Sequence, residues 1–256
     1  MVQEVLINDD YYVPDANQLV TEDDTPVDNF ASEKQQRLLV GSLYSSIQQQ
    51  QTFLAAANVG IYHTDGQPAI VPDVFLSLDV QAPENWWEKQ NRCYMVWRFG
   101  KPPEVVLEIV SNKEGDELGK KLQIYEQIRA SYYIVYDPNQ QLGEKVLRVY
   151  ELRGRRYFET SENWLEQVGL GITLWEGEFE GRQDTWLRWC YQDGTVLLTG
   201  DERAEQGQQR AEQERQRAEQ ERQRAEQEQQ RAEQAEQRAQ LLADRLRAMG
   251  VDPDSL

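Results

Sequence analysis

Glu104-Val-Val-Leu-Glu-Ile-Val-Ser111 is the stretch that decides the fold, because it is almost wholly apolar and carries one carboxylate, Glu108, near its middle. A run this apolar predicts a central β-strand that is covered on both faces. Strand side chains alternate, which places Glu108 on the same face as Val106 and Val110. A buried, ionised carboxylate costs several kcal/mol unless a cation or a metal meets it. The group that meets Glu108 therefore leads to the function.

A strand–helix–strand unit is expected on the C-terminal side of this run. Apolar residues recur at helical spacing between Glu114 and Arg129, and residues 131–136 are again typical of a strand. A unit of this size predicts a parallel strand pair joined by a right-handed crossover. Two strands are then expected within residues 145–159, around a turn at Arg153-Gly154, and short strands and loops that cover one side of the sheet within 163–199.

The N-terminal side of the run predicts one helix and several strands. Ser32 fits the N-cap of a helix with a capping-box pattern, followed by an apolar stripe at helical spacing. Strands are expected within residues 53–63 and 69–79, and a short edge strand within 92–99. A polar loop or flap that holds Trp86-Trp87 precedes the edge strand.

The chain divides by composition into four parts. They are an acidic, turn-rich arm (1–30), a globular domain (31–199), a charged helix (201–249) and a short tail (250–256). No apolar stretch approaches the roughly 20 residues of a membrane span, and the N-terminus lacks the pattern of an export signal. The two cysteines have no metal-type spacing. We therefore expect a cytoplasmic protein with reduced thiols and no membrane partner.

A strict seven-residue repeat begins after Asp201. Arg recurs at positions 203, 210, 217, 224, 231, 238 and 245. The repeat predicts a helix of about 45 residues, roughly 70 Å long. A coiled coil requires apolar residues at two positions per heptad, whereas this repeat supplies one alanine until an apolar patch between Leu241 and Met249. Two alternatives remain: a self-standing charged helix with Arg–Glu contacts, or a weak coiled coil that forms a homo-oligomer.

The charge of the chain argues against a general nucleic-acid binder. The net charge is −18, and residues 1–200 hold 31 acidic and 17 basic residues. Nucleic-acid binding normally relies on Lys and Arg that neutralise phosphates. A local basic stripe on an acidic protein would still be compatible with such a partner.

Two carboxylates and one lysine are the candidate chemical groups. If the strands that carry Asp73 and Glu108 are neighbours, the two carboxylates converge and suit a hard cation such as Mg²⁺. A helix that leaves the strand can return Lys121 to it, where the ammonium group would act on an attacking water and on phosphate charge. The alternative is a buried Glu108–Lys121 ion pair with Asp73 in a turn. Glu33, in the first turn of the first helix, is typical of a charge that complements the helix dipole.

Four motifs in order resemble the Uma2 family of restriction-endonuclease-like proteins, which belongs to the PD-(D/E)XK nuclease superfamily. The motifs are Val71-Pro-Asp-Val-Phe-Leu-Ser77, Lys101-Pro-Pro-Glu-Val-Val-Leu-Glu-Ile-Val-Ser111, Leu118-Gly-Lys-Lys-Leu-Gln-Ile-Tyr125 and Tyr132-Tyr-Ile-Val-Tyr-Asp-Pro138. The resemblance covers about residues 30–195. It implies a mixed α+β fold: a restriction-endonuclease-like core whose mixed β-sheet is flanked by helices, followed here by the long C-terminal helix.

The resemblance also implies a site. Asp73 and Glu108 would hold Mg²⁺ or Mn²⁺, with Glu33 as an additional acidic residue. The superfamily lysine two residues after the second acid is absent, because Val110 stands there, and Lys121 would replace it from the following helix. The implied function is a Mg²⁺-dependent DNA endonuclease. The alternative is a catalytically silent nuclease fold that acts as an interaction or oligomerisation module through its C-terminal helix.

Overall fold

The computed structural model describes residues 29–47, 51–111 and 116–250. The chain forms two compact units, Met1–Gly200 and Asp201–Leu256. Most of the expected N-terminal arm (1–28) and of the tail (251–256), together with the start of the helix expected from Glu114, lie outside the described residues.

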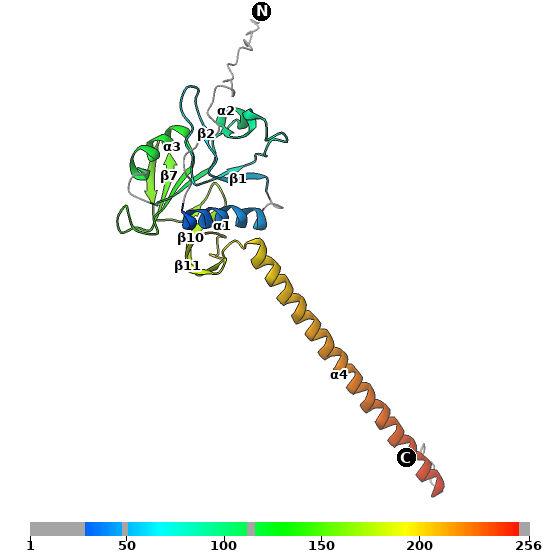
Figure 1. The fold of residues 1–256 in the computed structure, drawn as a ribbon. Coiled ribbons are helices and arrows are strands. Elements are labelled where there is room, and N and C mark those ends of the chain that lie inside the picture. The colour runs from blue at the N-terminus through cyan, green and yellow to red at the C-terminus, as the bar shows by residue number, and fades with distance from the viewer. Residues whose placement is uncertain (1–28, 48–50, 112–115, 251–256) are drawn as a thin grey trace, which may run out of the picture. The chain divides into compact units, whose positions relative to one another are not determined.

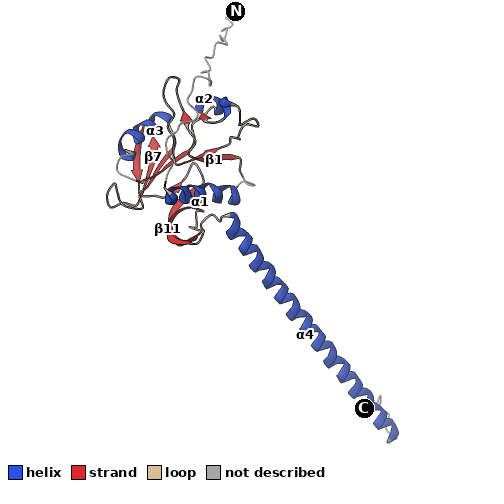
Figure 2. Cartoon of the chain, viewed as in Figure 1, coloured by secondary structure: helices blue, strands red, loops and turns tan. Residues whose placement is uncertain are grey.

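The first unit is a mixed α+β fold built on a six-stranded sheet (Figures 1 and 2). The strand order is β1-β3-β5-β6-β7-β8. The strands are β1 (Phe53–Ala57), β3 (Val74–Leu78), β5 (Val105–Ile109), β6 (Tyr132–Tyr136), β7 (Leu147–Arg153) and β8 (Arg156–Thr160). β5 and β6 are parallel and the other neighbours are antiparallel. The predicted fold class and the parallel pair around an interior β5 are therefore confirmed.

Strand β5 is buried along its whole length, and its side chains divide between two cores. Its odd-numbered residues belong to a cluster with helix α1 (Phe30–Ser46). Val106 belongs to a second cluster on the opposite face, together with Tyr125 and Ile128 of helix α3 (Leu122–Ile128). The alternation predicted from the apolar run is confirmed, and it puts the face that carries Glu108 under α3.

Helix α1 begins earlier than predicted. Its N-cap is Asn29, whose side-chain oxygen accepts from the backbone N–H groups of Ala31 and Ser32 at 3.0 Å each. The prediction of Ser32 as N-cap is wrong, because Asn29 satisfies the free N–H groups of the first turn. Ser32 is buried within the helix, and the apolar stripe around Leu39 and Leu43 packs in the core as predicted.

Two of the expected strands are shorter than predicted. Residues 53–63 divide into β1 and a two-residue strand, β2 (Ile61–Tyr62), which pairs in parallel with β4 (Tyr94–Met95). The prediction of an edge strand up to Phe99 is wrong beyond Met95, because α2 (Val96–Phe99) makes one helical turn. Gly100 closes that turn in the left-handed conformation, with φ of 76°, which glycine adopts without a Cβ penalty. A short 3₁₀ turn, η2 (Lys89–Asn91), lies in the preceding loop.

A second sheet has the order β11-β10-β9 and packs in the same core as α1, on one face of the six-stranded sheet. Its strands are β9 (Trp164–Leu165), β10 (Leu170–Phe179) and β11 (Arg182–Cys190). The expectation of only short strands here is wrong, because β10 and β11 form a long hairpin. The two loop residues, Glu180 and Gly181, both have positive φ, which suits the twist of a two-residue hairpin.

The second unit is the long C-terminal helix α4 (Gly200–Ala248), 49 residues in length. The predicted charged helix is therefore present over the whole seven-residue repeat. Among the described residues, none of the helices combines the length and the apolar character that crossing a membrane requires.

Candidate active site

Glu108 lies in the buried face of β5 and accepts two hydrogen bonds from one helix. Its exposed fraction is 2 %. The Lys121 ammonium group donates to Oε2 at 2.9 Å, and the Tyr125 hydroxyl donates to Oε1 at 2.6 Å. Both carboxylate oxygens are therefore held from the same side. The cation that the sequence required for Glu108 is Lys121.

A π-helical turn, η3 (Glu117–Lys121), carries Lys121 and continues into α3, which carries Tyr125. Lys121 N–H donates to the carbonyl of Asp116, and the Asp116 side chain accepts from the backbone of Lys120. A Cβ at Gly119 would overlap the Asp116 carboxylate and would have to displace it from the backbone of Lys120. Lys121 and Tyr125 stand four residues apart, so their side chains lie on one helix face.

Asp73 faces the same site from the bend immediately before β3. The pairing of Val74 with Leu107 sets Asp73 opposite Glu108 in the antiparallel register, and opposite residues share a face of the sheet. The backbone N–H of Ile109 donates to Asp73 Oδ2 at 2.5 Å. Gln36 of α1 donates to Oδ1 at 2.8 Å. The Asp73 carboxylate is thus held by the backbone of β5 and by α1, at the bend that precedes β3.

The carboxylates and the lysine shift one another's protonation. Burial raises the pKa of Glu108 to about 8, against the lowering effect of Lys121, while the nearby Asp73 raises it further. Burial acts to lower the pKa of Lys121, but Glu108 outweighs it and that pKa is raised. Burial and Glu108 both raise the pKa of Tyr125, so this hydroxyl keeps its proton and serves as a donor. Perturbed groups of this kind gather at functional sites.

Glu117 is a third carboxylate at the site that was not among the predicted site residues. Only 4 % of it is exposed, and its Oε1 lies 3.6 Å from the Lys121 ammonium. Its Oε2 is buried and has no hydrogen-bond partner among the described residues. A buried acceptor without a partner is costly, so a cation or a water that satisfies it would fit.

Glu33 is not part of this cluster. It is about half-exposed and forms an ion pair with Arg37 one helical turn away, at 3.0 Å. The residue of α1 that does reach the site is Gln36, which bridges Asp73 and Asn58. The sequence pointed to this helix but to Glu33 rather than Gln36, because an amide side chain in a helix is not typical of any one kind of site.

The donor set fits a hard cation with few protein ligands. Among the described residues, no group of three or more His, Cys, Asp or Glu side chains is arranged to hold a metal ion. Mg²⁺ commonly binds through one or two carboxylates and completes its shell with water and substrate phosphate. Asp73 and Glu108 supply that number of carboxylates. Glu117 adds a third carboxylate, whose Oε1 lies beside the same ammonium group.

The chain is similar to a known protein family and to a solved structure. A family model for Uma2, described as a putative restriction endonuclease, matches residues 18–175, more than half of the chain. A crystal structure of a putative nuclease belonging to DUF820 from Anabaena variabilis ATCC 29413 is similar at 17 % identity, with a TM-score of 0.38, over 55 % of this chain and 72 % of that one. None of the curated proteins matches the chain.

Proposed function

This chain belongs to the Uma2 family of putative restriction endonucleases, and on that premise we propose that it hydrolyses phosphodiester bonds of DNA with Mg²⁺ or Mn²⁺. The observation that carries the proposal is the position of Glu108. It is held by Lys121 and Tyr125 and stands opposite Asp73 in the strand register. Two carboxylates beside a lysine supply the groups that phosphodiester hydrolysis requires.

Each side chain has a distinct role in this proposal. Asp73 and Glu108 hold the metal, which when bound would polarise the phosphate and lower the pKa of a water. Lys121 positions the attacking water and stabilises the negative charge that develops on the phosphate. Tyr125 fixes the orientation of Glu108 through the hydrogen bond to Oε1. Gln36 and the Ile109 amide fix Asp73 in the same way.

Metal-dependent cleavage should increase with pH until about pH 8. Below its pKa of about 8, Glu108 carries a proton that competes with the metal, so metal affinity should rise about tenfold per pH unit and then level off. The measurements are nicking of supercoiled plasmid and cleavage of single-stranded DNA between pH 6 and 9, in Mg²⁺, Mn²⁺ or EDTA, with metal affinity from calorimetry. Cleavage that persists in EDTA, or an affinity that falls with pH, would contradict the proposal.

We also infer that copies of the chain self-associate through α4, so that this helix would act as an oligomerisation module. Between Ala232 and Met249, small or apolar residues alternate at spacings of three and four: Ala232, Ala235, Ala239, Leu242, Leu246 and Met249. This spacing is that of the a and d positions of a coiled coil. In the preceding repeats the d positions are Glu214, Glu221 and Glu228. The C-terminal third of α4 is therefore the part that would pair.

Truncation of α4 should convert an oligomer into a monomer. Sedimentation equilibrium of the full chain, of a chain that ends at Thr199, and of a Leu242→Glu, Leu246→Glu variant would measure the mass directly. The exposed polar face supplies a matched control, Gln230→Glu with Gln237→Glu. We expect only the truncation and the leucine variant to dissociate. An unchanged mass on truncation would exclude α4 as the assembly element.

A further inference from the structure

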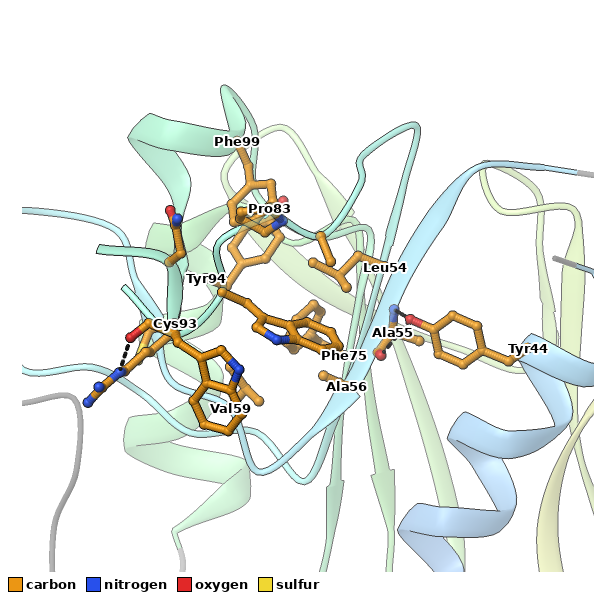
Figure 3. A pocket seen from close by; sticks show the side chains of 15 residues that line it. Tyr44, Leu54, Ala55, Ala56, Val59, Phe75, Pro83, Cys93, Tyr94 and Phe99 are labelled. Atoms are coloured by element: carbon orange, nitrogen blue, oxygen red, sulfur yellow. Dashed lines mark hydrogen bonds between the residues drawn. The ribbon is translucent and has the colours of Figure 1, made fainter. Parts of the chain in front are cut away.

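An aromatic pocket lined by residues of β1, β3 and the loop before β4 takes no part in the chemistry described above (Figure 3). Its volume is about 550 Å³, within the range of small-molecule sites. Its walls include Leu54, Phe75, Tyr94, Phe99, Trp86 and Trp87. Tyr94 stacks on Phe99 at 4.3 Å between ring centroids, and its ring edge meets Phe75 at 5.1 Å. The pocket is thus built mainly from flat, apolar surfaces.

The pocket and the carboxylates share one face of the sheet. Phe75 lies two residues after Asp73 in the same stretch of chain, so the two side chains point to the same face about 7 Å apart. Phe75 also pairs with Val106, two residues before Glu108. A ligand that spans the pocket and the carboxylates would therefore follow strands β3 and β5 along this face.

Two tryptophans of the loop before β4 line this pocket with large exposed surfaces. Trp86 is 59 % exposed and Trp87 is 81 % exposed. The Arg92 guanidinium donates to the Trp87 carbonyl at 3.0 Å, which ties down the backbone of the pair. Exposed neighbouring tryptophans are unusual on a surface without a partner, and they are typical of platforms on which nucleobases stack.

The charge and the polar atoms at the pocket also suit a nucleotide. Residues 81–98 contain three basic and two acidic residues, in a chain whose first 200 residues are strongly acidic. Asn91 also lines the pocket and adds a polar side chain to its mainly aromatic wall.

We propose that this pocket stacks an unpaired nucleobase of the substrate strand, next to the phosphate that the carboxylates and Lys121 act on. The inference rests on the proposed nuclease function and adds to it the kind of DNA that is favoured: single-stranded or locally unpaired. Stacking of one base on aromatic side chains contributes about 1–3 kcal/mol. The pocket would therefore prefer a strand with bases over a bare phosphodiester chain.

The test compares two ligands of equal charge. The probes are a fluorescent single-stranded thymidine oligomer and an abasic phosphodiester oligomer of the same length, titrated against the full chain carrying Glu108→Gln to prevent cleavage. We expect the thymidine oligomer to bind about tenfold or more tightly. The double substitution Trp86→Ala, Trp87→Ala should remove this preference, whereas Phe158→Ala, an exposed aromatic residue on β8, should leave it unchanged.

The outcomes separate this inference from the proposed function. If the wild-type chain cleaves DNA but the two oligomers bind equally, or the tryptophan variant keeps the preference, the stacking pocket is wrong and the nuclease site stands. If the chain neither binds nor cleaves any DNA, both are wrong. Binding of an apolar fluorescent dye in the pocket without binding of the thymidine oligomer would point to an apolar ligand and overturn the inference.

Discussion

Glu108→Gln and Asp73→Asn are each expected to reduce DNA cleavage by about 10³-fold or more, with little change in folding. Each substitution removes a charged ligand of the proposed metal site, and a bound metal would supply several kcal/mol of transition-state charge stabilisation. The expected loss is measured as single-turnover cleavage of supercoiled plasmid at saturating Mg²⁺. Metal affinity measured by calorimetry should fall in both variants.

The amide substitutions separate a loss of chemistry from a loss of fold. Gln at position 108 keeps the size of the side chain and an oxygen that accepts from Lys121 or Tyr125. Because the pKa of Glu108 is raised to about 8, a neutral group is already tolerated at this position near neutral pH. The melting temperature of Glu108→Gln should therefore stay close to that of the wild type. Asn at position 73 still accepts from the Ile109 amide, while its new N–H₂ group faces the donor of Gln36.

A carboxylate immediately before the same strand gives a matched control. Glu104 begins the segment that leads into β5 and is held by Lys101 and by the Leu78 amide, away from the cluster. Glu104→Gln should retain nearly full cleavage. Activity that survives in Glu108→Gln would indicate a contaminating nuclease and would remove the basis of the mechanism. Equal losses in Glu104→Gln and Glu108→Gln would show that the effect is structural.

The sequence was sufficient to predict the parts of the site that rest on periodicity. The apolar run of β5 predicted a strand buried on both faces, and the two-residue alternation assigned Glu108 to one of them. Helical spacing brought Lys121 and Tyr125 to the same face of one helix, and both donate to Glu108. These patterns depend on residues close together in the sequence, so they can be recognised without knowing how distant segments pack.

The features that were missed depend on contacts between distant segments. Gln36 reaches Asp73 because α1 packs across the sheet, and nothing in its neighbourhood in the sequence marks an amide as a site residue. The π-helical turn is held by Asp116 and by the room at Gly119, and helical periodicity does not distinguish it from an α-helical turn. Asn29 and Ser32 are both good N-caps, and only the path of the chain before the helix decides between them.

The aromatic pocket also depends on a contact between distant segments that the sequence did not reveal. Trp86 and Trp87 were predicted to lie in a loop, and they do. The sequence contained no sign that this loop would meet Phe75 of β3 to form a pocket. The position of the pocket is therefore set by the packing of a loop on a strand, which is a tertiary property.

Lys121→Met is expected to lower the cleavage rate by about 10²–10⁴-fold, the usual contribution of a positioned general acid or base. Lys120→Met is the matched control, because Lys120 is the adjacent lysine and its side chain is exposed, so it should cleave like the wild type. Methionine keeps the length and apolar character of the Lys121 side chain, and helix η3 should therefore stay intact.

The pH dependence of the Lys121→Met variant separates two roles of the ammonium group. Lys121 lowers the pKa of Glu108, so its removal raises that pKa and shifts the rise in metal affinity to higher pH. If Lys121 acted only by keeping Glu108 ionised, cleavage by the variant would recover fully at pH 9 and above. If it also positions water and stabilises the phosphate charge, metal binding recovers at high pH while the rate stays low. We expect the second result, because the Lys121 ammonium lies 2.9 Å from the Glu108 carboxylate, and a phosphate bound at the proposed metal site would lie within its reach.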